Sequence, residues 1–133
     1  EYLTVLASIL LPIRLSGRAV TSDIRDRAHE LARRAGIQAL LKRRPQRLSQ
    51  GERQRAAICR ALIGNPRLVL ADEPTGNLDE KNARDVLDLI IELNNNQNTA
   101  LLIVTHDLSI ANKMSRQFDL SDGCINERSS KLS

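Results

Sequence analysis

The chain has 133 residues, a length that suits one compact domain, and 41% of them are apolar, which is enough for a core and argues against global disorder. Aromatic residues make up only 2%, which argues against a base-stacking surface for single-stranded nucleic acid and means that the core must be aliphatic. The formal charge of +4 is unevenly distributed along the chain. Residues 1–66 carry 13 basic and 5 acidic side chains, whereas residues 67–133 carry 7 basic and 11 acidic side chains.

The first 47 residues predict a helical region. Residues 3–15 are apolar with an interruption at Pro12, and Gly17 ends this segment. A second helix is predicted after the N-cap residues Thr21-Ser22-Asp23, because apolar side chains then recur at helical spacing as far as a stop at Gly36.

A short apolar piece over residues 37–41 leads into a basic segment that ends at Pro45. The helix that follows is the clearest in the chain, because Ser49 precedes Glu52 by three residues, which is the spacing of a capping box. Gly64 and the residues directly after it end this helix.

The second half predicts a strand–helix–strand unit. The apolar runs 68–71 and 100–104 are typical of strands buried on both faces, and residues 80–94 between them carry an apolar helical face. Such a unit is parallel with a right-handed crossover, which makes the fold class α/β. We further expect a short helix over 107–114 and a terminal hairpin over 117–126.

The cysteines and the hydropathy pattern indicate in which cellular compartment the protein is expected. Cys59 and Cys124 lie far apart and form no C-x-x-C pair, which favours two buried thiols in a reducing cytosol over a disulfide or a zinc site. The longest apolar run, Val5 to Ile13, is too short to span a membrane. We therefore expect neither a signal peptide nor a transmembrane helix.

Acidic side chains and a histidine follow the two strands. Asp72 and Glu73 end the first strand, and His106 follows the second. Because parallel strands end at one edge of a sheet, these groups are expected to come together there. An apolar strand that ends in Asp is the Walker B pattern, in which the carboxylate holds Mg²⁺, usually through water, and Glu73 can then act as general base on a water.

The capped helix offers an anion-binding tip. Its first amides point outward with the positive end of the helix macrodipole, Ser49 adds a hydroxyl, and Gly51 permits a close approach. Each motif also has a structural alternative: Asp72 and Glu73 as a solvated strand end, His106 as a capping or surface residue, and Ser49 as an ordinary cap.

Taken together, these motifs resemble the ATP-binding domain of ABC transporters. Four segments stand in family order and spacing, namely the signature (Leu48 to Arg55, with Gln50 in place of the usual first Gly), Walker B with the catalytic glutamate (Leu68 to Pro74), the D-loop (Thr75 to Asp79) and the H-loop (Val104 to Asp107).

The resemblance implies a partial P-loop NTPase-like ABC ATPase domain. Residues 1–47 would form part of its helical subdomain, residues 48–127 the signature helix and the C-terminal part of the core, and residues 128–133 a tail. No Gly-x-x-x-x-Gly-Lys-Ser/Thr occurs in the chain, so the P-loop that cradles phosphates is absent from it. The chain therefore resembles the C-terminal part of an ABC ATPase, which alone is expected neither to bind ATP tightly nor to hydrolyse it.

The resemblance also implies cofactors, partners and roles. ATP and Mg²⁺ would be the cofactors, with Asp72 as the metal residue, Glu73 and His106 as the catalytic residues, and Asp79 in the D-loop near the nucleotide. A second ATPase subunit would pair by two-fold symmetry, so that the signature serves the partner's ATP through four residues: Ser49, Gln50, Gly51 and Glu52. Permease subunits in the inner membrane would hold the protein at its cytoplasmic face.

The segment Ala71 to Asp79 resembles the branch of the family with lipoprotein-releasing, macrolide-export and cell-division ATPases. Residues 65–70 and 113–117 are most similar to the lipoprotein-releasing type, with the other two as alternatives. A truncated, non-catalytic module also remains open. A nucleic-acid binder is disfavoured, because the basic run Lys42-Arg43-Arg44 lacks aromatic residues around it and is typical of a solvated face.

Overall fold

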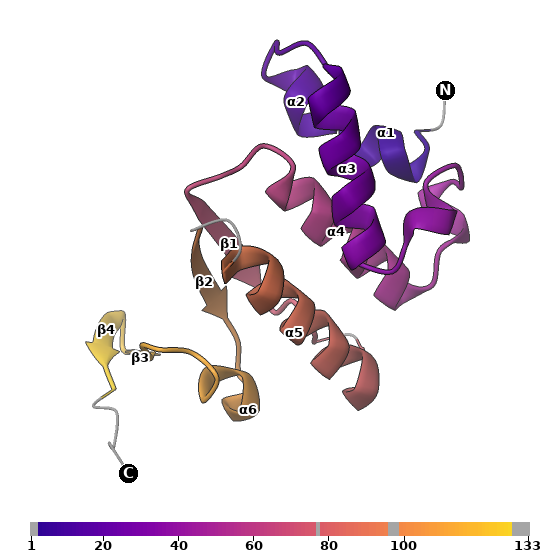
Figure 1. The fold of residues 1–133 in the computed structure, drawn as a ribbon. Helices are drawn as coiled ribbons and strands as arrows, with labels where there is room; N and C mark the ends of the chain where they lie inside the picture. Colours follow the sequence, from indigo (N-terminus) through magenta and orange to yellow (C-terminus); the bar gives the residue numbers. More distant parts are fainter. Residues whose placement is uncertain (1–2, 77, 96–98, 129–133) are drawn as a thin grey trace. The chain divides into compact units, whose positions relative to one another are not determined.

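The computed structural model describes residues 3–76, 78–95 and 99–128. It divides into two compact units, residues 1–103 and residues 104–133 (Figure 1). No helix among the described residues is both long and apolar enough to cross a membrane.

The first unit opens with helices, as predicted. α1 (Val5–Ile9) and α2 (Leu11–Leu15) are separated at Leu10, and Pro12 lies in the first turn of α2, where its missing N–H costs no helical hydrogen bond. α3 (Ser22–Arg34) begins at the Thr21 cap and ends before Gly36, whose φ of +69° is the left-handed conformation that glycine adopts at helix ends.

Two short 3₁₀ turns, η1 (Gln38–Leu40) and η2 (Pro45–Arg47), connect α3 to α4 (Gln50–Leu62). α4 is the central helix of the first unit, because it contacts α1, α2, α3 and α5 (Figure 1). Its buried side chains join one aliphatic core with those of its neighbours, including Val5, Ile9, Ile13, Ala28, Leu31, Ile58, Cys59, Leu62, Val86, Ile90 and Leu93.

The strand–helix–strand unit is confirmed. β1 (Leu68–Asp72) and β2 (Ala100–Val104) are neighbours in a two-stranded sheet, and α5 (Glu80–Asn95) connects them. The Ala100 N–H donates to the carbonyl of Arg67 at 2.9 Å, so both strands begin at the same end of the sheet and run in the same direction.

The predicted burial of these strands on both faces is wrong. Leu68, Leu70 and Leu102 are 51%, 69% and 50% exposed, whereas Val69 and Leu101 pack against the core. Successive side chains of a strand point to opposite faces, so the helical core of the described residues covers only one face of this sheet.

The second unit contains α6 (Leu108–Ala111) and a hairpin of β3 (Phe118–Ser121) and β4 (Cys124–Glu127). The strands are antiparallel, and the turn residues Asp122 and Gly123 have φ of 50° and 75°, as a two-residue type I′ turn requires. The predicted hairpin is therefore confirmed.

The expectation of two buried thiols holds for one cysteine only. Cys59 is fully buried in α4, and burial raises the pKa of its thiol to about 12. Cys124 is exposed, like the other residues of β3 and β4.

Candidate functional site

The first turn of α4 has the predicted capping box. The hydroxyl of Ser49 accepts the Glu52 N–H at 3.3 Å, and the Glu52 carboxylate accepts the Ser49 N–H at 2.7 Å. The hydrogen bond from the Ser49 backbone is the main cause that lowers the pKa of Glu52, and the charge of Arg43 adds a smaller effect. Glu52 therefore holds the cap in its ionised form.

Two amides of this turn point away from the helix. The N–H groups of Gln50 and Gly51 occupy the first two helical positions, where no carbonyl of the helix can accept from them. Gly51 has no side chain to cover them, and they lie at the positive end of a 13-residue helix. Together with the Ser49 hydroxyl, they form a group of donors that fits a phosphate.

The start of α5 lies beside this turn. The carboxylate of Asp79 caps α5 by accepting the Asn82 N–H at 3.1 Å, and it also accepts from the Asn82 side-chain amide. These bonds lower the pKa of Asp79. A Cβ on Gly51 would lie 3.4 Å from Oδ1 of Asn82, so the Asn82 side chain lies beside Gly51 as well as beside Asp79.

Asn82 was not among the predicted site residues. The spacing of three between Asp79 and Asn82 is an N-cap signal that could have shown the bond between them. Its approach to Gly51 depends on how α4 packs against α5, which no local pattern in the sequence encodes.

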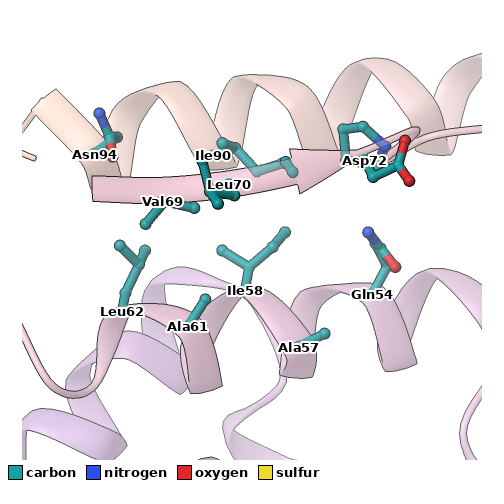
Figure 2. A pocket seen from close by; sticks show the side chains of 12 residues that line it. Gln54, Ala57, Ile58, Ala61, Leu62, Val69, Leu70, Asp72, Ile90 and Asn94 are labelled. Carbon is teal, nitrogen blue, oxygen red and sulfur yellow. The ribbon is translucent and has the colours of Figure 1, made fainter. Parts of the chain in front are cut away.

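Asp72 and Glu73 stand at the end of β1, as predicted. Asp72 is exposed at one end of a cavity of about 210 Å³ between α4 and β1, and Gln54 lies at the same end (Figure 2). Elsewhere the cavity is lined mainly by apolar side chains such as Ile58, Leu62 and Val69 (Figure 2). The carboxylate thus lies where the core-facing side of β1 ends at water.

Glu73 has an unusual backbone conformation. Its φ of 41° lies in the left-handed region, which is uncommon for a residue with a side chain. The Gly76 N–H donates to the Glu73 carbonyl at 3.2 Å and closes the turn. Strained backbone of this kind is concentrated at functional positions, and here it falls on the residue predicted to be the general base.

The described residues contain no group of three or more His, Cys, Asp or Glu side chains that could hold a metal ion. A cation at Asp72 would therefore need ligands besides the His, Cys, Asp and Glu side chains of this part of the chain. Water and phosphate oxygens are such ligands for Mg²⁺.

His106 lies in the second unit and is exposed. Beside it, the Thr105 hydroxyl accepts the Asp107 N–H at 3.1 Å, and Asp107 caps α6 by accepting the Ser109 N–H at 2.8 Å. The bonds from Ser109 are the main cause that lowers the pKa of Asp107. The expected meeting of His106 with Asp72 and Glu73 stays a prediction, and Asn77 of the D-loop lies outside the described residues.

The fold and the order of these motifs define an ATP-binding cassette. A family model described as ABC transporter matches residues 4–76, a range that includes both the signature turn and the end of β1. The chain belongs to the ABC transporter family. The resemblance seen in the sequence and the partial ABC ATPase fold are thereby confirmed.

One relative points to a particular member of the family. The lipoprotein-releasing system ATP-binding protein LolD of Hydrogenovibrio crunogenus is 52% identical over 121 residues, which are 91% of this chain and 52% of the relative. The chain thus spans about half the length of this relative.

Solved structures of ABC transporter cassettes are similar to this chain in sequence and in fold. A dimeric bacterial ABC transporter cassette, MJ0796, is 36% identical with a TM-score of 0.79, and the match covers 95% of this chain and 56% of that one. A dimeric post-hydrolysis state of the same cassette bound to ADP and Pi is 35% identical with the same TM-score and coverage.

Proposed function

We propose that this chain is the C-terminal part of the ATP-hydrolysing subunit of a bacterial ABC transporter that releases lipoproteins from the inner membrane. The observation that carries the proposal is the 52% identity with LolD over nearly the whole chain. The donor group at the start of α4 and the carboxylates at the end of β1 supply the chemistry that such a subunit needs.

Asp72 and Glu73 would have different roles at the end of β1. ATP supplies the bond to be cleaved, and Mg²⁺ neutralises charge on its phosphates. Asp72 would hold the metal through water, since its carboxylate is exposed and no other acidic cluster in the described part of the chain surrounds it. Glu73 would accept the proton of the attacking water, and His106 would contact the terminal phosphate.

The signature would serve a second nucleotide. Ser49, Gln50, Gly51 and Glu52 would face the ATP of a partner ATPase subunit across a two-fold axis, with Asp79 at the same interface. The position of Asn82 supports this, because it binds Asp79 and its side chain lies beside Gly51, so the two motifs are near each other. Permease subunits would bind the dimer at the cytoplasmic face of the membrane.

The 133-residue chain alone is proposed to be inactive, because it contains no P-loop to hold the phosphates. Titration of ATP into this chain should show no binding in the micromolar range. Micromolar affinity would contradict this part of the proposal.

The catalytic role of Glu73 is tested in the full-length protein by Glu73→Gln. The amide keeps the size of the side chain but cannot accept the proton, so ATP binding should remain while hydrolysis falls by about 10²- to 10⁴-fold. The matched control is Glu80→Gln at the exposed start of α5, where the Glu80 carboxylate pairs with Arg84 and should not affect the rate. Normal hydrolysis by Glu73→Gln would contradict the general-base role.

A further inference from the structure

The segment between η1 and α4 presents a hollow lined by basic side chains. Lys42, Arg43, Arg44 and Arg47, all exposed, line this open hollow of about 710 Å³. We call these four residues the basic loop.

The backbone of the basic loop is held in place. Buried Leu41 and Leu48, each 4% exposed, anchor its two ends in the core. The Val5 N–H donates to the Arg43 carbonyl at 2.9 Å, and the Arg47 N–H donates to the Arg44 carbonyl at 3.0 Å. The basic side chains therefore project from a fixed turn and not from a loose run of charge.

The basic loop places four basic side chains within six residues of sequence, with no acidic residue among them. Glu52 is the acidic group on which Arg43 acts, and the carboxylate of Glu52 is already occupied by the Ser49 N–H at 2.7 Å. Positive charges gathered around a concave surface focus the electric field and attract anions. Arginine guanidinium groups also match the geometry of phosphate oxygens, to which they donate two hydrogen bonds at once.

We propose that the basic loop is a binding site for a phosphate-bearing anion with two or more negative charges, either a soluble polyphosphate or the headgroup of an anionic phospholipid. The basic loop adjoins the signature turn, but none of its four residues is among those proposed to act on ATP, so this site goes beyond the proposed function. A nucleic acid is the less favoured ligand, because Phe118 is the only Phe, Tyr or Trp among the described residues and it lies in the other unit.

The test compares four forms of the full-length protein: wild type, a loop variant, a control variant and a variant that keeps the charge. The loop variant is Lys42→Gln/Arg43→Gln/Arg47→Gln. The control variant is Arg14→Gln/Arg18→Gln/Arg25→Gln, which removes the same charge from exposed positions of the same unit. Circular dichroism checks that all forms are folded, and Arg43→Lys/Arg47→Lys, which keeps the charge, serves as a second variant.

Two probes distinguish the two sources of phosphate. Calorimetry measures binding of pyrophosphate, and flotation measures binding to phosphatidylcholine vesicles with and without phosphatidylglycerol. Any other site that binds pyrophosphate is present in all forms of the protein. A difference in affinity between the loop variant and the control variant therefore reports on the basic loop. For at least one probe, the loop variant should bind about tenfold more weakly than wild type or the control variant.

Each outcome decides the proposal. Loss of pyrophosphate binding alone assigns the site to a soluble polyphosphate, and loss of vesicle binding alone assigns it to a lipid headgroup. The Lys variant should retain binding of that probe, more weakly than wild type. Equal behaviour of the loop and control variants with both probes overturns the proposal. Loss of binding to a DNA duplex without any effect on the two probes overturns it as well.

Discussion

At the scale of single residues, the first turn of α4 uses Ser49 and Glu52 for the cap and leaves the amides of Gln50 and Gly51 for a ligand. This division follows from helix geometry, because only the side chains of the cap and of the third helical position can reach back to the end of the helix. Substitutions of the cap residues should therefore affect mainly stability, whereas substitutions at Gly51 should affect mainly activity.

Gly51→Asp should abolish ATP hydrolysis by the full-length protein without unfolding it. An acidic residue in the first turn of a helix interacts favourably with the macrodipole, and its Cβ would meet only the movable Asn82 side chain, at 3.4 Å. Stability should stay within about 0.5 kcal/mol, while the new charge repels a phosphate. Urea unfolding and a phosphate-release assay measure the two effects.

The control for this substitution is Gly64→Asp, just beyond the other end of α4, where an added Cβ meets nothing within 4 Å. It adds the same charge and should leave hydrolysis intact. Loss of hydrolysis in both variants, or unfolding of Gly51→Asp, would contradict the separation of the cap from the ligand site.

Glu52→Gln should reduce the sensitivity of folding to acid. The pKa of Glu52 is lower in the folded chain than in the unfolded chain, where it is about 4.3, chiefly because the Ser49 N–H donates to its carboxylate. Its stabilisation is thus complete above that unfolded value and is lost as the pH falls through the folded value.

The check is a series of urea midpoints between about pH 6 and pH 3 for wild type and for Glu52→Gln, a range that spans the unfolded pKa. The free energy of unfolding of the variant should fall less steeply below the unfolded pKa. If the free energy of unfolding falls equally with pH in wild type and in Glu52→Gln, the ionisation of the Glu52 carboxylate is not coupled to folding.

At the scale of elements, α4 connects the helices of the first unit. Arg27 of α3 donates to the carbonyls of Leu62 and Ile63 at 3.0 and 3.1 Å, at the end of α4. Arg55 of α4 donates to the Ala35 carbonyl at 3.2 Å and lies 3.6 Å from the Asp85 carboxylate of α5. Hydrogen bonds and an ion pair of two arginines thus join α4 to both α3 and α5.

Leu93→Ala on α5 should destabilise the chain by about 2–5 kcal/mol, because it leaves a cavity in the core. Leu93 is fully buried, whereas Leu15 at the end of α2 is 78% exposed. Leu15→Ala is therefore the matched control and should change stability by less than about 0.5 kcal/mol. Similar losses in urea midpoint for the two variants would contradict the described core.

The sequence predicted most of these elements because their signals are local. Thr21 and Ser49 mark helix starts, Gly36 marks a helix end, and Asp122-Gly123 marks the hairpin turn. The exposure of Leu70 could not be predicted, since it depends on what covers the sheet. The same holds for the approach of Asn82 to Gly51, which is a tertiary contact.

At the scale of the whole molecule, the chain spans about half the length of LolD and of the known cassettes that it matches. The basic first half contains the signature turn and the basic loop, and the acidic second half contains Asp72 and Glu73. In the proposed dimer, these halves act on different nucleotides: the carboxylates on the subunit's own ATP and the signature on that of its partner.

The most direct test of this division is ATP hydrolysis by mixed dimers of two inactive full-length variants, Glu73→Gln and Gly51→Asp. In a mixed dimer, one site combines the intact Glu73 of one subunit with the intact Gly51 of the other. Mixing and subunit exchange should therefore restore hydrolysis that neither variant shows alone. A mixture that stays as inactive as its components, although mixed dimers form, would contradict the account.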